Sequence, residues 1–359
     1  MRPLHLLLTI LSGLIVNAAL TPLIIHLAHR NRWYDEKNHR KIHTHDTPRI
    51  GGVGIFVALL AAMAVIVVFA ASAEGLGTAT PGALALYFLP ALAGMVMIHV
   101  LGLIDDFRNL RAVLKLFIQI AAAVVVCLGP YRIERLTIPF IWYNLELGWF
   151  SYPVTVLWIV AISNALNFID GVDGLAGGTA AIATLFFAAI ALLTGQIVVA
   201  LLAAGLFGSI LGFLIYNAPP ARIFMGDSGS YVLGFMLSLF PLMLADGSTT
   251  NLNLLPAITI LGVPIVDMTT SVFRRLGRGK HPFSADREHL HHKLMDVGLG
   301  TWRILAVAYT ASVVLGFVGV SWYLLPVNVD VLVTLASWAI VIALMIVLSR
   351  KRSGAGADR

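Results

Sequence analysis

The sequence contains few charged residues and a single cysteine. Charged residues make up 12% of the 359 residues and apolar residues 59%, whereas soluble domains contain about 25% charged residues. A water-soluble fold of this size cannot bury so much apolar surface, so the composition excludes a soluble enzyme and predicts an integral membrane protein. With only Cys127 present, an intrachain disulfide framework is excluded as well.

The sequence also lacks internal repeats, a second-domain boundary and any low-complexity tract beyond the final SGAGADR. We therefore expect a single integral membrane domain over residues 1–359. The first apolar run is too long for a secretory signal and has no small-residue exit before the charged residues that follow. It is interpreted as the first membrane span.

Eleven apolar segments are long enough, or nearly so, to cross a bilayer as helices. A hydrocarbon core about 30 Å thick needs about 20 apolar residues per helix. The pattern therefore predicts an all-α polytopic membrane protein. The predicted spans are residues 4–27, 52–72, 83–103, 112–129, 153–169, 177–194, 197–216, 229–244, 254–273, 303–325 and 330–349.

Basic residues are divided unevenly between the loops on the two sides of these spans. If the amino end starts outside, 21 of the 24 Lys and Arg residues fall on the opposite side. Only Arg2, Arg132 and Arg135 fall outside. The positive-inside rule makes the basic side cytoplasmic, so we expect an outer amino end and a cytoplasmic carboxyl end.

The clusters of unusual polar residues also lie on the cytoplasmic side. Asp105 and Asp106 follow the third span, where the helix dipole disfavours acids, so another group is expected to stabilise them. Adjacent carboxylates suit a proton acceptor or a cation site, and a solvated helix end is the alternative. Lys115 lies about a turn into the next span, where an ammonium is costly unless it meets an anion.

A second cluster, NALNFIDGVDG, places polar side chains at every third position. If the helix continues, Asn164, Asn167, Asp170 and Asp173 form one slowly winding stripe that faces one place. The glycines of this run are expected to open the helix so that backbone can approach a ligand. A plain turn is the alternative.

The third cluster, GDSGS, begins at Gly226 and leads into an apolar segment. Asp227 is predicted to lie beside the amino end of a helix, where a carboxylate is favoured. Mg²⁺ commonly binds through one or two carboxylates together with substrate phosphates. Chymotrypsin-like proteases carry the same letters around their nucleophile, but they need paired β-barrels, which a helical membrane chain does not supply.

The fourth cluster, residues 281–293, is rich in histidine and also contains Arg287. Such donors suit phosphate or sugar oxygens. Zinc is an alternative, but no cysteine joins the cluster and no paired i, i+4 histidines with an acid occur; a solvated loop also stays open. The sequence of the outer loop at residues 131–153 predicts a small hairpin at the membrane interface, to which no chemical role is assigned.

PRIGG at residues 48–52 comes first in the chain, and the four clusters follow it in the order given. In this order the motifs resemble those of the polyprenyl-phosphate N-acetylhexosamine-1-phosphate transferases, over about residues 30–295. The form ADREHLHH is similar to the bacterial branch that uses UDP-GlcNAc and undecaprenyl phosphate. The branch that uses UDP-MurNAc-pentapeptide usually has three adjacent histidines after Ala-Pro, whereas Leu290 interrupts the triplet here.

The resemblance implies roles for individual residues. Asp105 and Asp106 would be catalytic and flank the acceptor phosphate, while Asn167 and Asp227 would hold Mg²⁺, with Mn²⁺ as an alternative. Phe224 would stack on uracil. The full set of implied substrate-binding residues is Lys115, Asn164, Asp170, Asp173, Asn217, Phe224, Arg287, His289, His291 and His292.

The reaction implied by the resemblance is attack of a lipid phosphate oxygen on the sugar-bearing phosphorus of UDP-GlcNAc, with UMP leaving. Such a step needs in-line positioning and charge neutralisation, so direct displacement is expected. It would be the first membrane step of a cell-envelope glycan such as lipopolysaccharide or teichoic acid, at the cytoplasmic face of a bacterial inner membrane.

The expected partners are UDP-GlcNAc, undecaprenyl phosphate and the lipid bilayer, without nucleic acid, and a homodimer stays open. One alternative is the same reaction with another UDP-N-acetylhexosamine, including UDP-MurNAc-pentapeptide. A different class is a membrane transporter with broken helices, whose sequence sign would be interrupted spans repeated in two halves.

Overall fold

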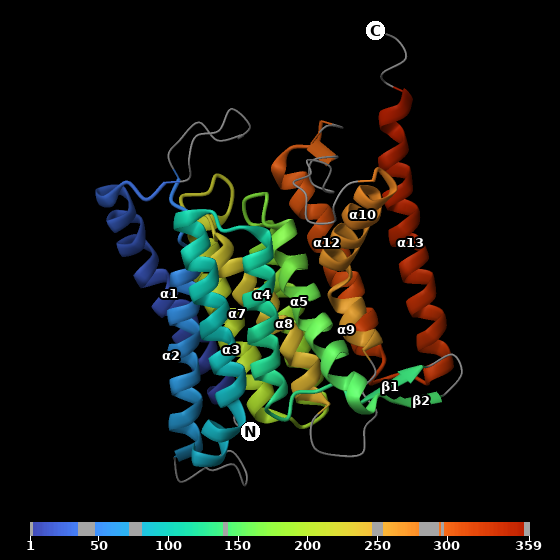
Figure 1. Ribbon diagram of the computed structural model, residues 1–359, viewed down its shortest axis with the longest axis horizontal. Helices are drawn as coiled ribbons and strands as arrows, with labels where there is room; N and C mark the ends of the chain where they lie inside the picture. The colour runs from blue at the N-terminus through green and yellow to red at the C-terminus, as the bar shows by residue number, and fades with distance from the viewer. Residues whose placement is uncertain are drawn as a thin grey trace.

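The computed structural model describes residues 3–34, 47–71, 81–138, 143–245, 254–279, 294–295 and 298–354. Its long helices run side by side in one bundle (Figure 1), so that backbone polar groups are paired within each segment, as a membrane requires. The helices are α1 (Pro3–Asn31), α2 (Gly52–Ala71), α3 (Pro81–Arg108), α4 (Ala112–Cys127), α5 (Ser151–Ile169), α6 (Leu175–Leu193), α7 (Ile197–Asn217), α8 (Asp227–Leu244), α9 (Leu255–Ile260), α10 (Gly262–Gly277), α12 (Thr301–Ser321) and α13 (Val327–Gly354).

Most of these helices can cross a bilayer. Within the described residues, eight helical segments are long and apolar enough, in α1, α2, α3, α5, α6, α7, α8 and α12. Two shorter apolar helices, α4 and α13 up to Ala343, bring the total to ten of the eleven predicted spans. A helical, multi-pass membrane fold is therefore confirmed, while the count of eleven stays a prediction.

The predicted span over residues 254–273 is helical but interrupted. The chain forms a short helix, Leu255–Ile260, and then a second helix, Gly262–Gly277. Pro264 has no N–H to donate to the carbonyl of Ile260, so a hydrogen bond is missing where the helix breaks. Apolar composition alone could not reveal this interruption.

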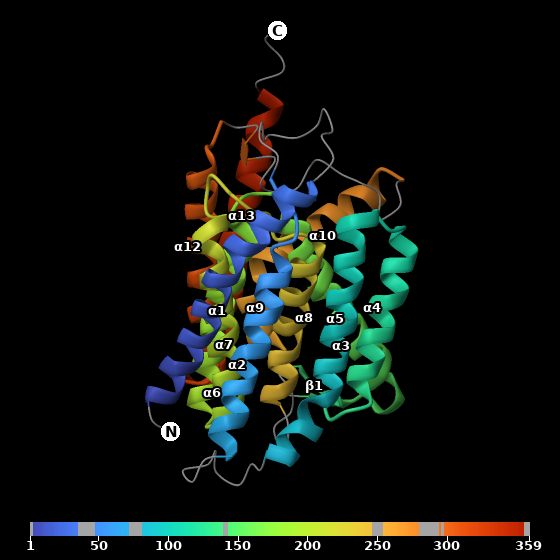
Figure 2. The same cartoon turned by 90° about the vertical axis from the view of Figure 1, so that its left-hand side faces the viewer.

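Helix α8 forms the centre of the bundle. It lies among the other helices in Figures 1 and 2, and 94% of its span is buried. It packs closely where small residues meet: Gly102 of α3 faces Ser228, and Gly234 faces Ser163 of α5. Several helix ends therefore converge on the point where α8 begins.

The predicted hairpin is present at the opposite end of the bundle from the start of α8. Strands β1 (Arg135–Ile138) and β2 (Tyr143–Glu146) pair antiparallel, with Arg135 opposite Glu146. Figure 1 places it beside the lower ends of the helices. The hairpin therefore lies away from the start of α8.

Candidate active site

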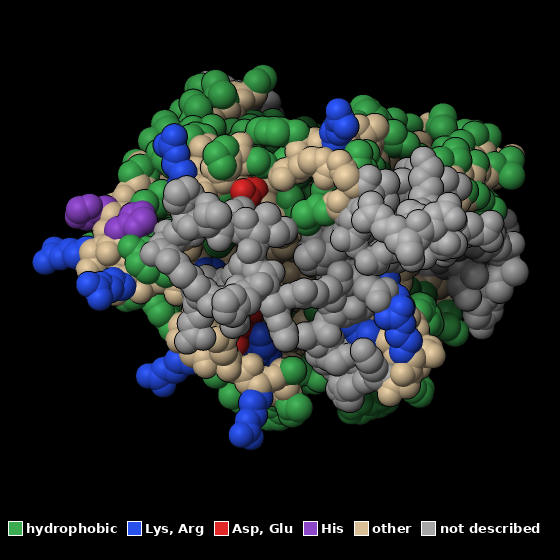
Figure 3. All heavy atoms as spheres, turned by 90° about the horizontal axis from the view of Figure 1, so that it is seen from above, with side chains coloured by type: hydrophobic (Ala, Val, Ile, Leu, Met, Phe, Trp, Pro, Cys, Tyr) green, Lys and Arg blue, Asp and Glu red, His purple; other side chains and the backbone are tan. Residues whose placement is uncertain are grey.

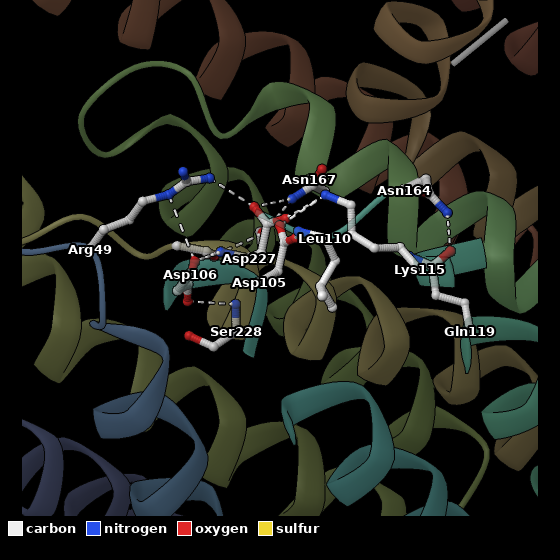
Figure 4. Close-up of polar contacts among 12 residues, drawn as sticks. Arg49, Asp105, Asp106, Leu110, Lys115, Gln119, Asn164, Asn167, Asp227 and Ser228 are labelled. Carbon is white, nitrogen blue, oxygen red and sulfur yellow. Dashed lines mark hydrogen bonds and ion pairs between the residues drawn. The ribbon is translucent and has the colours of Figure 1, made fainter. Parts of the chain in front are cut away.

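Four sequence motifs meet where α8 begins. The carboxyl ends of α3 and α5 and the amino ends of α4 and α8 bring their polar side chains together (Figure 4). Figure 3 looks onto this end of the bundle, where Lys and Arg side chains surround the face and acidic side chains lie between them. Residues far apart in the sequence thus form one polar cluster at the edge of the apolar bundle.

Asp227 is the hub of this cluster. Its Oδ1 atom accepts hydrogen bonds from a terminal nitrogen of Arg49 at 2.9 Å and from Nδ2 of Asn167 at 3.1 Å. Its Oδ2 atom lies 3.2 Å from Nζ of Lys115. The carboxylate is buried but fully paired, so its negative charge is stabilised by two cations and one amide.

Lys115 joins Asp227 to Asp105. Its Nζ atom lies 2.9 Å from Oδ2 of Asp105, while Oδ1 of Asp105 accepts the N–H of Leu110 at 2.6 Å. The Lys115 ammonium therefore lies beside two anions. These contacts offset the free-energy cost of placing a charged lysine near the membrane edge.

Asp106 has a different set of partners from its neighbour. Its two oxygens accept the backbone N–H groups of Asp227 at 2.7 Å and of Ser228 at 3.1 Å. These N–H groups belong to the first turn of α8, so Asp106 acts as an amino-terminal cap supplied by another helix. The positive end of α8 thus stabilises this acid, which the dipole of its own helix disfavours.

Gly226 allows this approach. Its φ of 74° lies in the left-handed region, and a Cβ atom there would collide with the carboxylate of Asp106. A larger residue would therefore separate α3 from the start of α8.

Arg49 is a site residue that the sequence analysis missed. The segment around it is held against residues 224–225 by backbone hydrogen bonds, from Phe224 to Pro48 at 2.7 Å and from Gly51 to Phe224 at 2.9 Å. Its Nε atom lies 3.7 Å from Asp106, beside the shorter contact with Asp227. Its place inside the PRIGG motif was the signal from which it could have been predicted.

The electrostatics around Arg49 are dominated by carboxylates. Burial lowers the pKa of the Arg49 guanidinium, but the charges of Asp227 and Asp106 outweigh burial and raise this pKa above its ordinary value. The guanidinium therefore stays charged and neutralises part of the acid cluster.

The two asparagines of α5 are oriented by Gln119, which sequence reasoning missed, and by Ser230 of the GDSGS motif. Asn164 donates to Oε1 of Gln119 at 2.7 Å, and Asn167 donates to Oγ of Ser230 at 3.0 Å. Gln119 lies one helical turn beyond Lys115, so its place on the same face of α4 was a readable signal.

The polar stripe expected for a continuing helix ends with Asn167, because the helix itself ends two residues later. Helix α5 ends at Ile169, and the chain turns at Gly174, whose φ is 79°. Asp173 therefore points to another connection, where its Oδ2 atom accepts the N–H of Ala221 at 2.9 Å. Residues three positions apart lie on one face only while the helix continues, so the spacing predicts a stripe no further than the end of α5.

Asn217 also holds backbone in place. Its Oδ1 atom accepts the N–H of Gly174 at 3.0 Å, and its Nδ2 atom donates to the carbonyl of Ile223 at 2.8 Å. It thus ties the turn after α5 to the connection between α7 and α8. Its contacts are those of a structural residue that supports the site.

Asp170, at the end of α5, has a perturbed carboxyl group. Burial raises its pKa to about 7; the charge of Arg49 opposes this rise, and those of Asp227 and Asp106 add to it. The carboxyl group of Asp170 is therefore close enough to feel the charges of the acid cluster, although among the described residues no hydrogen bond joins it to them. Its implied role in substrate binding stays a prediction.

Phe224 and the histidine cluster contain the remaining residues that the resemblance implies for substrate binding. Phe224 is half-buried, and its backbone pairs with the PRIGG segment, while its stacking role stays a prediction. The histidine cluster lies outside the described residues, and this holds for Arg287, His289, His291 and His292.

The donor set suits a hard cation. Within the described ranges no group of three or more His, Cys, Asp or Glu side chains forms a metal cluster. Mg²⁺ needs only one or two protein carboxylates, because phosphates and waters supply the other ligands. The oxygens of Asp227 and Asn167 therefore fit Mg²⁺ better than zinc.

Comparison with known proteins agrees with these motifs. The model of "Glycosyl transferase family 4" matches residues 88–245. A probable undecaprenyl-phosphate N-acetylglucosaminyl 1-phosphate transferase of Bacillus subtilis is 36% identical over 309 residues, which cover 86% of this chain and 82% of that protein.

Two further relatives represent neighbouring branches. A phospho-N-acetylmuramoyl-pentapeptide-transferase of Halalkalibacterium halodurans is 30% identical and covers 92% of this chain and 98% of its own. An undecaprenyl-phosphate alpha-N-acetylglucosaminyl 1-phosphate transferase of Escherichia coli K12 is 29% identical, over 80% of this chain and 75% of its own.

The matched segment runs through α3, α4, α5 and α8, which carry the acids, Lys115 and both asparagines of the cluster. The relatives extend this match over most of the chain. On this combination of sequence and site, the chain belongs to glycosyl transferase family 4, the membrane family of polyprenyl-phosphate N-acetylhexosamine-1-phosphate transferases.

Proposed function

We propose that the protein transfers GlcNAc-1-phosphate from UDP-GlcNAc to undecaprenyl phosphate and releases UMP. The observation that carries this proposal is the cluster of Asp105, Asp106, Asp227, Arg49 and Lys115 at one end of an apolar bundle. A lipid phosphate and a water-soluble nucleotide can meet only at such an edge. The named activities of the Bacillus subtilis and Escherichia coli relatives support the same reaction.

In the proposed reaction, an oxygen of the lipid phosphate forms a bond to the sugar-bearing phosphorus. The bond from that phosphorus to the bridging oxygen breaks, and UMP leaves with the electron pair. The acceptor phosphate is already largely ionised near neutral pH, so a general base is not required. Direct displacement is favoured, because the site offers cations and fixed positions.

The residues divide this work according to their contacts. Lys115 and Arg49 would neutralise phosphate oxygens, because they are the cations of the cluster. Asp105 holds Lys115 in place, and Asp106 fixes the first turn of α8. Asp227 and Asn167 would hold Mg²⁺, or Mn²⁺, which when bound supplies positive charge to the diphosphate.

We further propose an inner-membrane location with the amino end outside and the active site cytoplasmic. The uneven distribution of basic residues supports this orientation. A membrane-impermeant thiol reagent added to intact cells should label Trp149→Cys, on the hairpin side, but not Arg222→Cys, near the acid cluster. Both positions are exposed. Labelling at position 222 alone would reverse the orientation.

A second candidate substrate is UDP-MurNAc-pentapeptide, because the Halalkalibacterium halodurans relative matches nearly the whole chain. Purified protein should be given undecaprenyl phosphate, Mg²⁺ and each of several UDP-sugars, with UMP release measured. We expect release with UDP-GlcNAc. Release with UDP-MurNAc-pentapeptide alone would move the protein to the other branch, and no release with any sugar would overturn the proposal. A homodimer is compatible with either substrate.

A further inference from the structure

We propose that His99, in α3, is a positioning residue for the transfer reaction. Its imidazole ring holds the carbonyl group of Ser228 and so sets the direction in which the carboxylate of Asp227 points. This inference rests on the proposed function, and it gives a role to a buried side chain that lies outside the acid cluster.

The first step of the argument is the position of His99 on α3. It lies seven residues before Asp106, which is two helical turns away on the same face of the helix. Gly102 lies between them on this face, and a Cβ atom there would collide with backbone atoms of Ser228. This face of α3 therefore lies directly against the first turn of α8, with a polar side chain on either side of the contact.

The second step is that these two side chains hold opposite ends of one residue. Asp106 accepts the backbone N–H of Ser228 at 3.1 Å, and Nδ1 of His99 lies 3.3 Å from the carbonyl oxygen of Ser228. A carbonyl oxygen only accepts hydrogen bonds, so Nδ1 carries the hydrogen and donates it. The same oxygen has a second lone pair for the hydrogen bond within the helix. His99 therefore adds a contact without interrupting α8.

The third step is that the ring of His99 has a fixed plane. Phe56 of α2 stacks on it, with ring centroids 4.0 Å apart and planes 2° apart. His99 is only 6% exposed, so its ring is enclosed by the helices around it. The donor is therefore directed at α8 by packing as well as by the hydrogen bond.

The fourth step links this contact to the chemistry. Asp227 lies on the turn that His99 holds, and its carboxylate meets three side chains from different parts of the chain. These are Arg49 at 2.9 Å, Asn167 at 3.1 Å and Lys115 at 3.2 Å. A rotation of the turn would change all three distances together, and a displacement of about 1 Å in a site can lower the rate about a hundredfold. His99 therefore acts on the reaction through the orientation of Asp227.

Three variants separate the hydrogen bond from the packing. His99→Phe keeps a flat ring against Phe56 and removes the donor. His99→Asn removes the ring but places its amide nitrogen close to the position of Nδ1, so a donor is kept. Phe56→Leu keeps His99 and removes the stacking.

UMP release by the purified variants measures the effect on the reaction. In His99→Phe we expect kcat to fall about tenfold, the scale of one hydrogen bond, while the KM for UDP-GlcNAc stays within about threefold. His99→Asn and Phe56→Leu should keep kcat within about threefold of the wild type, although both lose the stacked pair and with it some thermal stability. A role in stability alone predicts the reverse order, because kcat would then follow the Tm.

Hydrogen–deuterium exchange tests the contact without substrate. In His99→Phe the amides in the first turn of α8 should exchange about fivefold faster, because one of the contacts of that turn with α3 is lost. In His99→Asn and Phe56→Leu they should exchange at nearly the wild-type rate. If the wild-type protein released no UMP, the proposed reaction would fall, while exchange would still decide whether His99 holds α8.

Several results would overturn the role of His99. They are a wild-type kcat in folded His99→Phe, unchanged exchange in that variant, or a fall in kcat for Phe56→Leu as large as for His99→Phe. Thermal unfolding checks the fold of each variant. If His99→Phe does not fold, His99→Leu takes its place and is compared with His99→Asn, because both lack the stacked ring and they differ in the donor.

Discussion

Two neighbouring regions of the site use similar residues in different ways. In the acid cluster, the carboxylate of Asp227 meets the side-chain cations Arg49 and Lys115. In the turn after α5, Asp173 and Asn217 instead accept backbone N–H groups. Side-chain cations can exchange a carboxylate for a phosphate, whereas a buried backbone N–H must keep its acceptor. The first region is therefore suited to bind charge, and the second holds the fold around it.

Asp106 lies on the border between the two regions. The sequence pairs it with Asp105, but its shortest contacts are backbone N–H groups of α8. Substitutions in the two regions should thus separate activity from stability, and Asp106 should affect both.

The largest effect is expected for Asp227→Asn. The loss of the central negative charge should lower turnover by about a hundred- to a thousandfold, as for removal of a preorganised charged group. UMP release by purified protein measures this loss, and an unchanged thermal unfolding curve is the control. Turnover at the wild-type rate would show that Asp227 is not the hub of the chemistry.

The variants Asp106→Asn and Asp105→Asn should separate an effect on stability from an effect on activity. Asp106→Asn weakens the cap of α8, which should cost about 1 kcal/mol and lower the Tm by about 2–4 °C. Asp105→Asn removes a partner of Lys115, so we expect lower turnover with little change in Tm. Unfolding in detergent and UMP release give both quantities. A larger drop in Tm for Asp105→Asn would reverse the assignment.

Asn217→Ala tests the second region. It leaves the N–H of Gly174 without its acceptor, which should lower the free energy of unfolding by about 1–3 kcal/mol. Turnover, measured well below the Tm, should stay within about tenfold of the wild type, because the acid cluster keeps its contacts. Loss of turnover without loss of stability would place Asn217 in contact with substrate instead.

The smallest effect is expected for Tyr309→Phe. The hydroxyl of Tyr309, in α12, donates to the carbonyl of Gly174 at 2.7 Å. Removing this one hydrogen bond should cost about 1 kcal/mol and raise the KM for UDP-GlcNAc by less than about fivefold. The kcat should be unchanged. A fall in kcat with a constant KM would instead connect Tyr309 with the chemical step.

The membrane class, the eight helices long and apolar enough to cross a bilayer among the described residues, and the outer hairpin could all be predicted from the sequence. These features follow from local properties, namely the length of apolar runs and the alternation of side chains. The order of the motifs was also sufficient to indicate the family. None of these inferences needed knowledge of which segments touch.

How the polar residues divide their work could not be predicted from the sequence. The cap made by Asp106, the place of Arg49 between two acids and the turn of Asp173 toward Ala221 all join segments far apart in the chain. A carboxylate can be stabilised by a cation, an amide or a helix end, and composition does not distinguish among these partners. Only the convergence of helix ends on α8 determines which partner each carboxylate meets.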